Sequence, residues 1–216
     1  GIFTHFAVAD DPDSTFTQTQ LERFLSATES LPGTEQTLIR HAANSAATIL
    51  DTRTHLGMVR VGIALYGLHP SKATVGRAAL SPALSLKAEV ASVKHIGAGE
   101  GVSYGLTYRA SGPTRIALVP AGYGDGYSRL LSNAAEVLIG GRRLTVSGTV
   151  CMDQFMVDVG NHPVAAGDEV VLIGKQGAEE ITVDEIARHM GTINYEVTCL
   201  ISQRVPRLYH GAGHGS

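Results

Sequence analysis

Residues 58–68 read MVRVGIALYGL, and this stretch decides how the first third of the chain is interpreted. Almost every side chain in it is apolar or Gly, and its length fits a fully buried strand. Arg60 lies in the middle, and burying a permanently charged guanidinium without partners is costly. We therefore expect Arg60 to face a group that makes its position tolerable.

Outward from this stretch, strand-like and helix-like segments alternate. The expected strands are GIFTHFAVA at 1–9, TLIRHAAN at 37–44 and MVRVGIALYG at 58–67. A helix is expected from Phe16 to about Ser30, closed by Leu31-Pro32-Gly33, and a short helix over SAATIL after the capping residue Asn44. This order implies βαβ units and a parallel sheet. Three parallel strands cannot close a barrel and leave bare edges, so we expect further strands upstream.

The remainder of the chain has a different character. Residues 1–70 form the parallel part, 71–83 are predicted to be a linker, 84–210 a mostly antiparallel β domain, and 211–216 a disordered tail. Gly140-Gly141 indicates a hairpin turn, and a helix over ITVDEIARHM is expected to begin at Thr182, with Glu185 in a capping box, and to end at Gly191. NYEVTCLIS and RVPRLYH are expected to be the last strands.

Composition excludes several classes of function. The 216 residues are 44% apolar and 17% charged, with a net charge of −3 and no basic run, so neither nucleic acid nor an anionic membrane is an expected partner. No apolar run approaches the length of a membrane span, and no cysteine or histidine set has zinc spacing. Cys151 and Cys199 fit free thiols in a reducing cytoplasm better than a single disulfide.

Polar residues lie at or near the ends of the three expected parallel strands. They are His5, then His41, Asn44 and Ser45, then Arg60 and Gly62. Ligand sites of parallel α/β sheets lie at the carboxyl ends of strands, so these groups are placed to meet one ligand. Backbone N–H groups at Asn44-Ser45 and Gly62-Ile63 favour an anion such as phosphate. The alternatives are a core histidine at His5, a helix-start role for Ser45 and a carboxylate partner for Arg60.

Three Gly-containing stretches mark the second part. VSYGLTY contains Tyr104 and Tyr108, PAGYGDGYSR contains Tyr123, and VSGTVCMDQFMVD contains Met152. Composition alone favours ordinary turns at all three.

Taken together, these stretches resemble the alanine racemase family. The matching segments run in order from GIFTHF through HAANSA, MVRVGIALYG, VSYGLTY, PAGYGDGYSR, GTVCMDQFMVD and NYEV to RVPRLY. The resemblance implies the last three strands of a (β/α)8 TIM-type barrel followed by the β domain. It also implies interconversion of L- and D-alanine by a pyridoxal 5′-phosphate enzyme with two bases, in a homodimer, supplying D-alanine for peptidoglycan.

The resemblance also implies roles for individual residues. Arg60 is similar to the arginine that hydrogen-bonds the cofactor's pyridine nitrogen; because it only donates, that nitrogen stays unprotonated. A related decarboxylase is expected to have glutamate here. Tyr104 resembles one catalytic base, supplied by the partner subunit, His5 the histidine beside that tyrosine, and His41 the support of Arg60. The implied phosphate set is Ser45, Gly62, Ile63 and Tyr195, with Asn44 beside it; Met152 is implied to meet the substrate carboxylate, and Tyr123 to line the entrance.

One departure from the family pattern is large. The family's other base is a lysine that holds the cofactor as a Schiff base, and the lysines of this chain, Lys72, Lys87, Lys94 and Lys175, have no matching context. We expect about five barrel strands upstream to be missing and the chain alone to be inactive. The alternatives are a racemase for another small amino acid such as serine, or a non-catalytic β-domain module.

Overall fold

The computed structural model describes residues 1–29, 31 and 38–211. The chain divides into two compact units, Gly1–Ala83 and Leu84–Ser216, which we call unit 1 and unit 2. The predicted helix closure at Pro32-Gly33 and the predicted tail at 212–216 lie outside the described residues.

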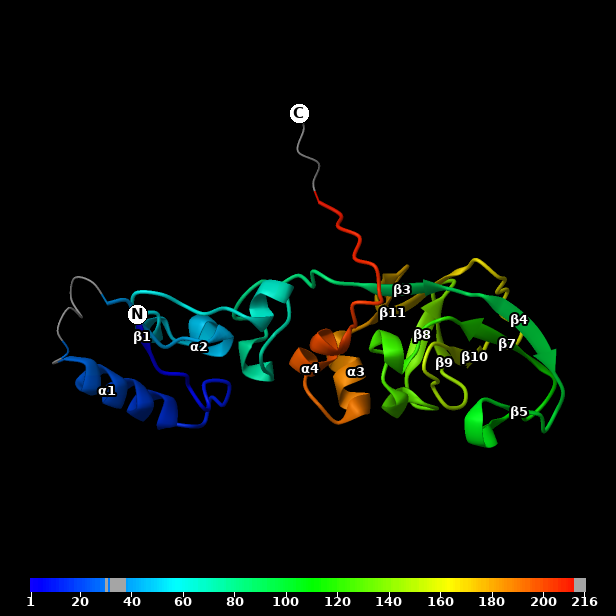
Figure 1. Ribbon diagram of the computed structural model, residues 1–216, viewed down its shortest axis with the longest axis horizontal. Coiled ribbons are helices and arrows are strands. Elements are labelled where there is room, and N and C mark those ends of the chain that lie inside the picture. Colours follow the sequence, from blue (N-terminus) through cyan, green and yellow to red (C-terminus); the bar gives the residue numbers. More distant parts are fainter. Residues whose placement is uncertain (30, 32–37, 212–216) are drawn as a thin grey trace, which may run out of the picture. The chain divides into compact units, whose positions relative to one another are not determined.

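Unit 1 is built on a short parallel pairing. Strand β1 (Ile2–Phe3) pairs with β2 (Arg40–His41), and Met58 adds a single parallel bridge to His41. Its helices are α1 (Phe16–Glu29), α2 (Ser45–Leu50) and the 3-10 turns η1 (Thr52–Thr54), η2 (Ile63–Tyr66) and η3 (Lys72–Thr74). The parallel order predicted from the sequence is confirmed (Figure 1).

The core of unit 1 lies between α1, α2 and the pairing. Its buried residues are Phe6, Ala9, Leu21, Ala42, Ala43, Ala46 and Ala47. Small alanines after β2 let α2 pack closely against the strands, so the residues that begin α2 are held firmly beside the strand ends.

The strands of unit 1 are shorter than predicted. The stretch 58–67 forms only the bridge at Met58, and its second half is the 3-10 turn η2 rather than a strand. Gly62 leaves the extended conformation with φ −105° and ψ −93°, and Gly67 ends the turn with φ +75°. A side chain at Gly67 would collide with the carbonyl of Ser81 at 1.7 Å, so glycine is required there.

Residues 71–83, predicted to be a linker, belong to unit 1. Thr74 in η3 is fully buried, and the Ala83 amide donates to the Tyr66 carbonyl at 3.0 Å.

Unit 2 is antiparallel in all its described strand pairs. One sheet has the order β10-β7-β4, another β12-β11-β8-β9 with β3 also on β11, and β5 pairs with β6 (Figure 1). The strand bounds are β3 Leu86–Glu89, β4 Ser92–Ile96, β5 Gly101–Val102, β6 Tyr108–Arg109, β7 Thr114–Val119, β8 Glu136–Ile139, β9 Arg142–Thr145, β10 Phe155–Asp158, β11 Glu169–Gln176 and β12 Glu179–Ile181. The helices are α3 Val183–Met190 and α4 Asn194–Leu200, with 3-10 turns η4 Tyr104–Leu106, η5 Tyr123–Asp125 and η6 Arg129–Leu131.

Local signals in unit 2 predicted several features correctly. Gly140 and Gly141 have φ of +59° and +74° and join β8 to β9. The Thr182 hydroxyl accepts the Glu185 amide at 3.0 Å at the start of α3, and Gly191 ends the helix with φ +69°. Fully buried side chains such as Phe155, Leu138 and Leu172 form the core.

The two strands predicted for the end of the chain are wrong. NYEVTCL forms helix α4, and residues 204–210 form no strand. The buried residues Asn194, Val197 and Ile201 recur at helical spacing, while Tyr195 and Leu200 face outward. This helical burial outweighs the strand preference of the Tyr, Val and Thr side chains.

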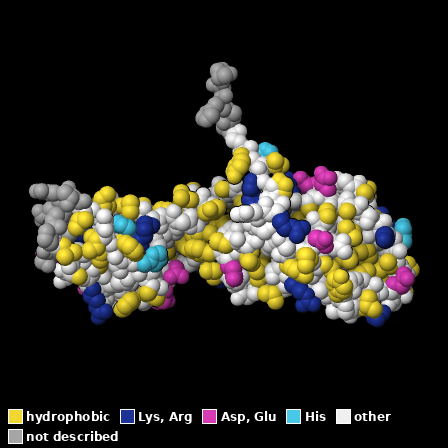
Figure 2. Space-filling model, viewed as in Figure 1, with side chains coloured by type: hydrophobic (Ala, Val, Ile, Leu, Met, Phe, Trp, Pro, Cys, Tyr) yellow, Lys and Arg dark blue, Asp and Glu magenta, His cyan; other side chains and the backbone are white. Residues whose placement is uncertain are grey.

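On the face drawn in Figure 2, the Lys and Arg side chains of the described residues are scattered over both units rather than gathered in one patch. Within the described residues, no helix combines the length and apolar character needed to cross a membrane.

Candidate active site

Arg60 is the centre of a cluster at the strand ends of unit 1. Its Nη1 lies 2.7 Å from Nδ1 of His41, and its Nη2 donates to the carbonyls of Thr4 at 2.9 Å and Ala42 at 3.1 Å. The His5 ring nitrogen Nδ1 is 3.3 Å from Nη2, and the guanidinium carbon lies 5.2 Å from the Phe3 ring centre. Among the described residues Arg60 has no carboxylate partner. The guanidinium is therefore held by neutral acceptors, two carbonyls and an imidazole, and none of them carries a negative charge that would balance it.

The contact with Arg60 defines the state of His41. A guanidinium only donates, so Nδ1 of His41 is the acceptor and the imidazole is neutral. Burial and the positive charge of Arg60 both lower the pKa of His41. The Phe3 ring stacks on His41 with 5.3 Å between ring centres, which fixes the imidazole plane.

Asn44, Ser45 and Gly62 meet beside this cluster. The Asn44 side chain caps α2 by accepting the Ala47 amide at 3.0 Å. The buried Ser45 Oγ accepts the Gly62 amide at 2.9 Å and lies 3.5 Å from the Ala64 amide. A side-chain carbon placed on Gly62 would meet no atom within 4 Å. The result is a hydroxyl and backbone amides at the edge of open space, with Ile63 next in the chain.

His5 is not a core histidine. It is exposed, and its ring reaches the cluster through Nη2 of Arg60. The residues predicted for unit 1 fall in two adjacent groups. His5 and His41 contact Arg60, whereas Ser45 contacts Gly62 and Asn44 caps the same helix. The Arg60 amide donates to the Ala43 carbonyl at 2.9 Å, next to Asn44, and so joins the groups.

In unit 2, Tyr104 projects from the loop between β5 and β6. The side chain is 73% exposed, although its backbone is tightly held. The Thr149 hydroxyl donates to the Tyr104 carbonyl at 2.8 Å, and the Ser103 hydroxyl donates to the Thr149 carbonyl. Thr149 lies 45 residues from Tyr104, so no local sequence signal pointed to it.

Met152 and Tyr123 are also brought together. The Tyr123 amide donates to the Cys151 carbonyl at 3.0 Å and the Gly124 amide to the Met152 carbonyl at 2.8 Å. A side chain on Gly122 would lie 2.3 Å from the Cys151 carbonyl, so only glycine permits this approach. Residues 149–152 therefore connect the neighbourhoods of Tyr104, Tyr123 and Met152.

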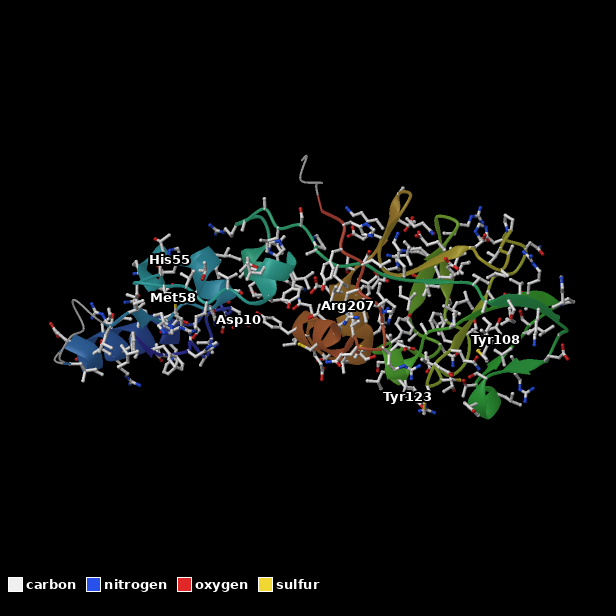
Figure 3. The ribbon with its side chains drawn as sticks, turned by 45° about the horizontal axis from the view of Figure 1, so that its top comes forward. Asp10, His55, Met58, Tyr108, Tyr123 and Arg207 are labelled. Atoms are coloured by element: carbon white, nitrogen blue, oxygen red, sulfur yellow. The ribbon has the colours of Figure 1, made fainter. Side chains whose placement is uncertain are left out.

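Tyr195 lies in the first turn of α4 and is 38% exposed. Figure 3 shows Tyr108 and Tyr123 well apart within unit 2, so the two Gly-containing loops do not form a single tyrosine cluster. Tyr108 has a separate structural partner, because its hydroxyl donates to the carboxylate of Asp158.

Two family models match the chain. Residues 1–70 match the family model "Alanine racemase, N-terminal domain", and residues 83–209, more than half of the chain, match "Alanine racemase, C-terminal domain". The chain belongs to the alanine racemase family.

Individual relatives agree with this assignment. An alanine racemase of Symbiobacterium thermophilum is 51% identical over 98% of this chain, and one of Halothermothrix orenii is 46% identical over 97%. In both cases the chain spans 56% of the relative's length.

Solved structures of the family confirm the predicted fold class, barrel strands followed by an antiparallel β domain. Alanine racemase from Bacillus anthracis with bound L-Ala-P superposes with a TM-score of 0.93 at 42% identity, covering 99% of this chain and 55% of that one. A Clostridium difficile alanine racemase in complex with cycloserine gives 0.86 at 42% identity, covering 95% and 54%.

Proposed function

We propose that this chain forms part of a pyridoxal 5′-phosphate enzyme that interconverts L-alanine and D-alanine. The observation that carries the proposal is the Arg60 cluster of an alanine racemase family member, a cation beside the ends of β1 and β2 that has no carboxylate partner among the described residues. The solved relatives that hold L-Ala-P and cycloserine support a ligand of the size of alanine.

The residues of unit 1 fit the cofactor. Arg60 would donate to the pyridine nitrogen, and His41 with the carbonyls of Thr4 and Ala42 keeps the guanidinium oriented for this contact. Because Arg60 cannot accept a proton, it would keep that nitrogen unprotonated and weaken electron withdrawal by the ring, which disfavours transamination.

The open space at Gly62 fits the phosphate. The Ser45 hydroxyl and the amides of Gly62 and Ile63 would bind it, with Asn44 fixing the start of α2. The Tyr195 hydroxyl would complete this set.

Pyridoxal phosphate, when bound, supplies the electron sink that acidifies the Cα–H bond of alanine. Racemisation then needs one base on each face of the planar carbon. We propose Tyr104 as one base, with His5 as its neighbour in the assembled site. The Met152 amide would bind the substrate carboxylate, and Tyr123 would line the entrance.

The second base is proposed to be a lysine outside this chain. The four lysines of the chain occur at 72, 87, 94 and 175, none on the segments that carry the Arg60 cluster. We further propose a homodimer in which Tyr104 serves the partner's site. The two free thiols favour a reducing cytoplasm, where D-alanine would be made for peptidoglycan.

The test is a chimera that joins this chain to the part of the Symbiobacterium thermophilum relative that it does not match. Conversion of L-alanine to D-alanine and the reverse are followed by chiral chromatography, with L-serine measured in parallel. We expect racemisation of alanine, and a fall of about 100-fold or more in both directions for Tyr104→Phe, because general acid–base groups contribute on this scale.

Tyr209→Phe is the matched control, because Tyr209 is 92% exposed and is not one of the proposed site residues. It should leave both rates unchanged. A chimera that binds pyridoxal phosphate without racemising alanine would contradict the proposed reaction. If the chimera racemises serine faster than alanine, the proposed substrate is wrong and serine takes its place.

A further inference from the structure

The loop that carries Tyr104 has an unusual backbone. Between the paired residues Val102 and Tyr108, Ser103 and Leu106 have φ of +65° and +48°, and Gly105 has +75°. Side-chain-bearing residues rarely adopt such angles, and they persist only where surrounding contacts enforce them. The contacts that enforce this conformation therefore decide where Tyr104 points.

Thr149 holds the loop at two successive residues. Its hydroxyl donates to the Tyr104 carbonyl at 2.8 Å, and its carbonyl accepts the Ser103 hydroxyl. Thr149 is only 5% exposed, and its neighbours are themselves anchored: the Gly148 amide donates to Asn133 Oδ1 at 2.6 Å and the Val150 amide to Ser132 Oγ at 2.9 Å. Thr149 is thus a fixed support beneath an exposed tyrosine.

A directional chain of hydrogen bonds ends at Tyr104. A hydroxyl has one hydrogen, and Thr149 uses it on the Tyr104 carbonyl, so Thr149 accepts from the Thr107 hydroxyl at 3.3 Å. Thr107 in turn accepts from Asn133 Nδ2 at 3.0 Å. In this series of hydrogen bonds each hydroxyl hydrogen has one acceptor, so the series favours a single arrangement of the Tyr104 loop.

We infer that Thr149 is a positioning residue for racemisation, which sets the direction of the Tyr104 ring by holding the Tyr104 carbonyl. This inference rests on the proposed function of Tyr104. A misplacement of about 1 Å at a reacting group lowers turnover by up to about 100-fold, whereas binding of substrate elsewhere in the site is little affected.

The test compares three variants of the chimera. Thr149→Val removes the hydroxyl and nearly keeps the side-chain volume; we expect kcat to fall about 10- to 100-fold with KM for alanine within about twofold. Thr149→Ser keeps the hydroxyl and should restore most of kcat. Thr74→Val is the matched control, because Thr74 is also buried and its hydroxyl donates to the Ser71 carbonyl within unit 1.

A second readout needs no activity. In the present chain, amide hydrogen exchange of residues 102–109 should accelerate in Thr149→Val and remain unchanged in Thr149→Ser and Thr74→Val. Unaltered exchange, or an unaltered kcat, in Thr149→Val would overturn the inference. If the parent chimera is inactive, the proposed function fails, while the exchange measurement still decides whether Thr149 holds the loop.

Discussion

Nη1 of Arg60 lies 2.7 Å from Nδ1 of His41, and this contact makes a neutral imidazole the support of a permanent cation. Protonated His41 would lose its acceptor and face the guanidinium as a like charge. The pairing therefore operates only while His41 is unprotonated.

The first prediction concerns the titration of His41. Burial and then the charge of Arg60 lower its pKa below the ordinary 6.5, so the unfolded chain binds the proton more readily. The free energy of unfolding should consequently fall as the pH drops through 6.5 toward the folded-state pKa. Arg60→Gln, which keeps a donor but removes the charge, should raise the pKa of His41 part of the way, because burial remains.

Histidine ring signals in an NMR pH titration measure this shift. Arg53→Gln is the control, since Arg53 pairs with Asp51 at 2.7 Å rather than with His41. The prediction is wrong if Arg60→Gln and Arg53→Gln leave His41 with the same titration curve.

The second prediction concerns Arg143, which joins β9 to its surroundings through three carboxylates. It lies 2.9 Å from Glu136, 3.0 Å from Glu179 and 2.7 Å from Glu185. Arg143→Met should lower the free energy of unfolding by about 1–3 kcal/mol at neutral pH, because it leaves the mostly buried Glu185 carboxylate without its cationic partner. Arg142→Met, at the exposed neighbouring position of β9, should have little effect.

The pH dependence of this loss follows from Glu185. The hydrogen bond from Arg143 holds the pKa of Glu185 below its ordinary 4.5, so its stabilising contribution is present above pH 4.5 and is lost as the pH falls through the folded-state pKa. Urea unfolding of the parent and of Arg143→Met should therefore give a smaller difference in the free energy of unfolding at pH 3 to 4 than at pH 7. An equal difference at both pH values would contradict the role of Glu185.

The third prediction concerns Tyr108, at the end of the Tyr104 loop. Burial and the hydrogen bond to Asp158 raise the pKa of Tyr108 to about 12, from 10. The unfolded chain then loses this proton first, so the contribution of Tyr108 is complete below pH 10 and is lost as the pH rises toward 12. Tyr108→Phe should lower the free energy of unfolding by about 1 kcal/mol at neutral pH. As the pH rises above 10, the free energy of unfolding of this variant should fall less steeply than that of the parent.

Chemical unfolding at pH 8 and in the alkaline range provides the comparison. The exposed Tyr209→Phe serves as control and should match the parent at every pH. Parallel stability curves for Tyr108→Phe and the parent above pH 10 would show that Asp158 does not hold the Tyr108 proton.

Sequence patterns predicted those features that depend on neighbouring residues. The cap at Asn44, the turn at Gly140-Gly141 and the Thr182 and Gly191 boundaries of α3 are each decided within a few residues by hydrogen-bonding side chains or positive φ. The run at 58–67 and the helix α4 were predicted wrongly as strands, because apolar and β-branched side chains suit both structures and only their packing separates them.

The sequence by itself determined the family, the order of the segments and the polar groups at the strand ends, because these are written in residue type and spacing. Only the tertiary structure decided what Arg60 faces and what holds Tyr104. The acceptors of Arg60 include carbonyls from Thr4 and Ala42, 56 and 18 residues away, and the support of Tyr104 comes from Thr149. Backbone carbonyls are the same at every residue, so no side-chain pattern marks which of them the folded chain will bring to a charge.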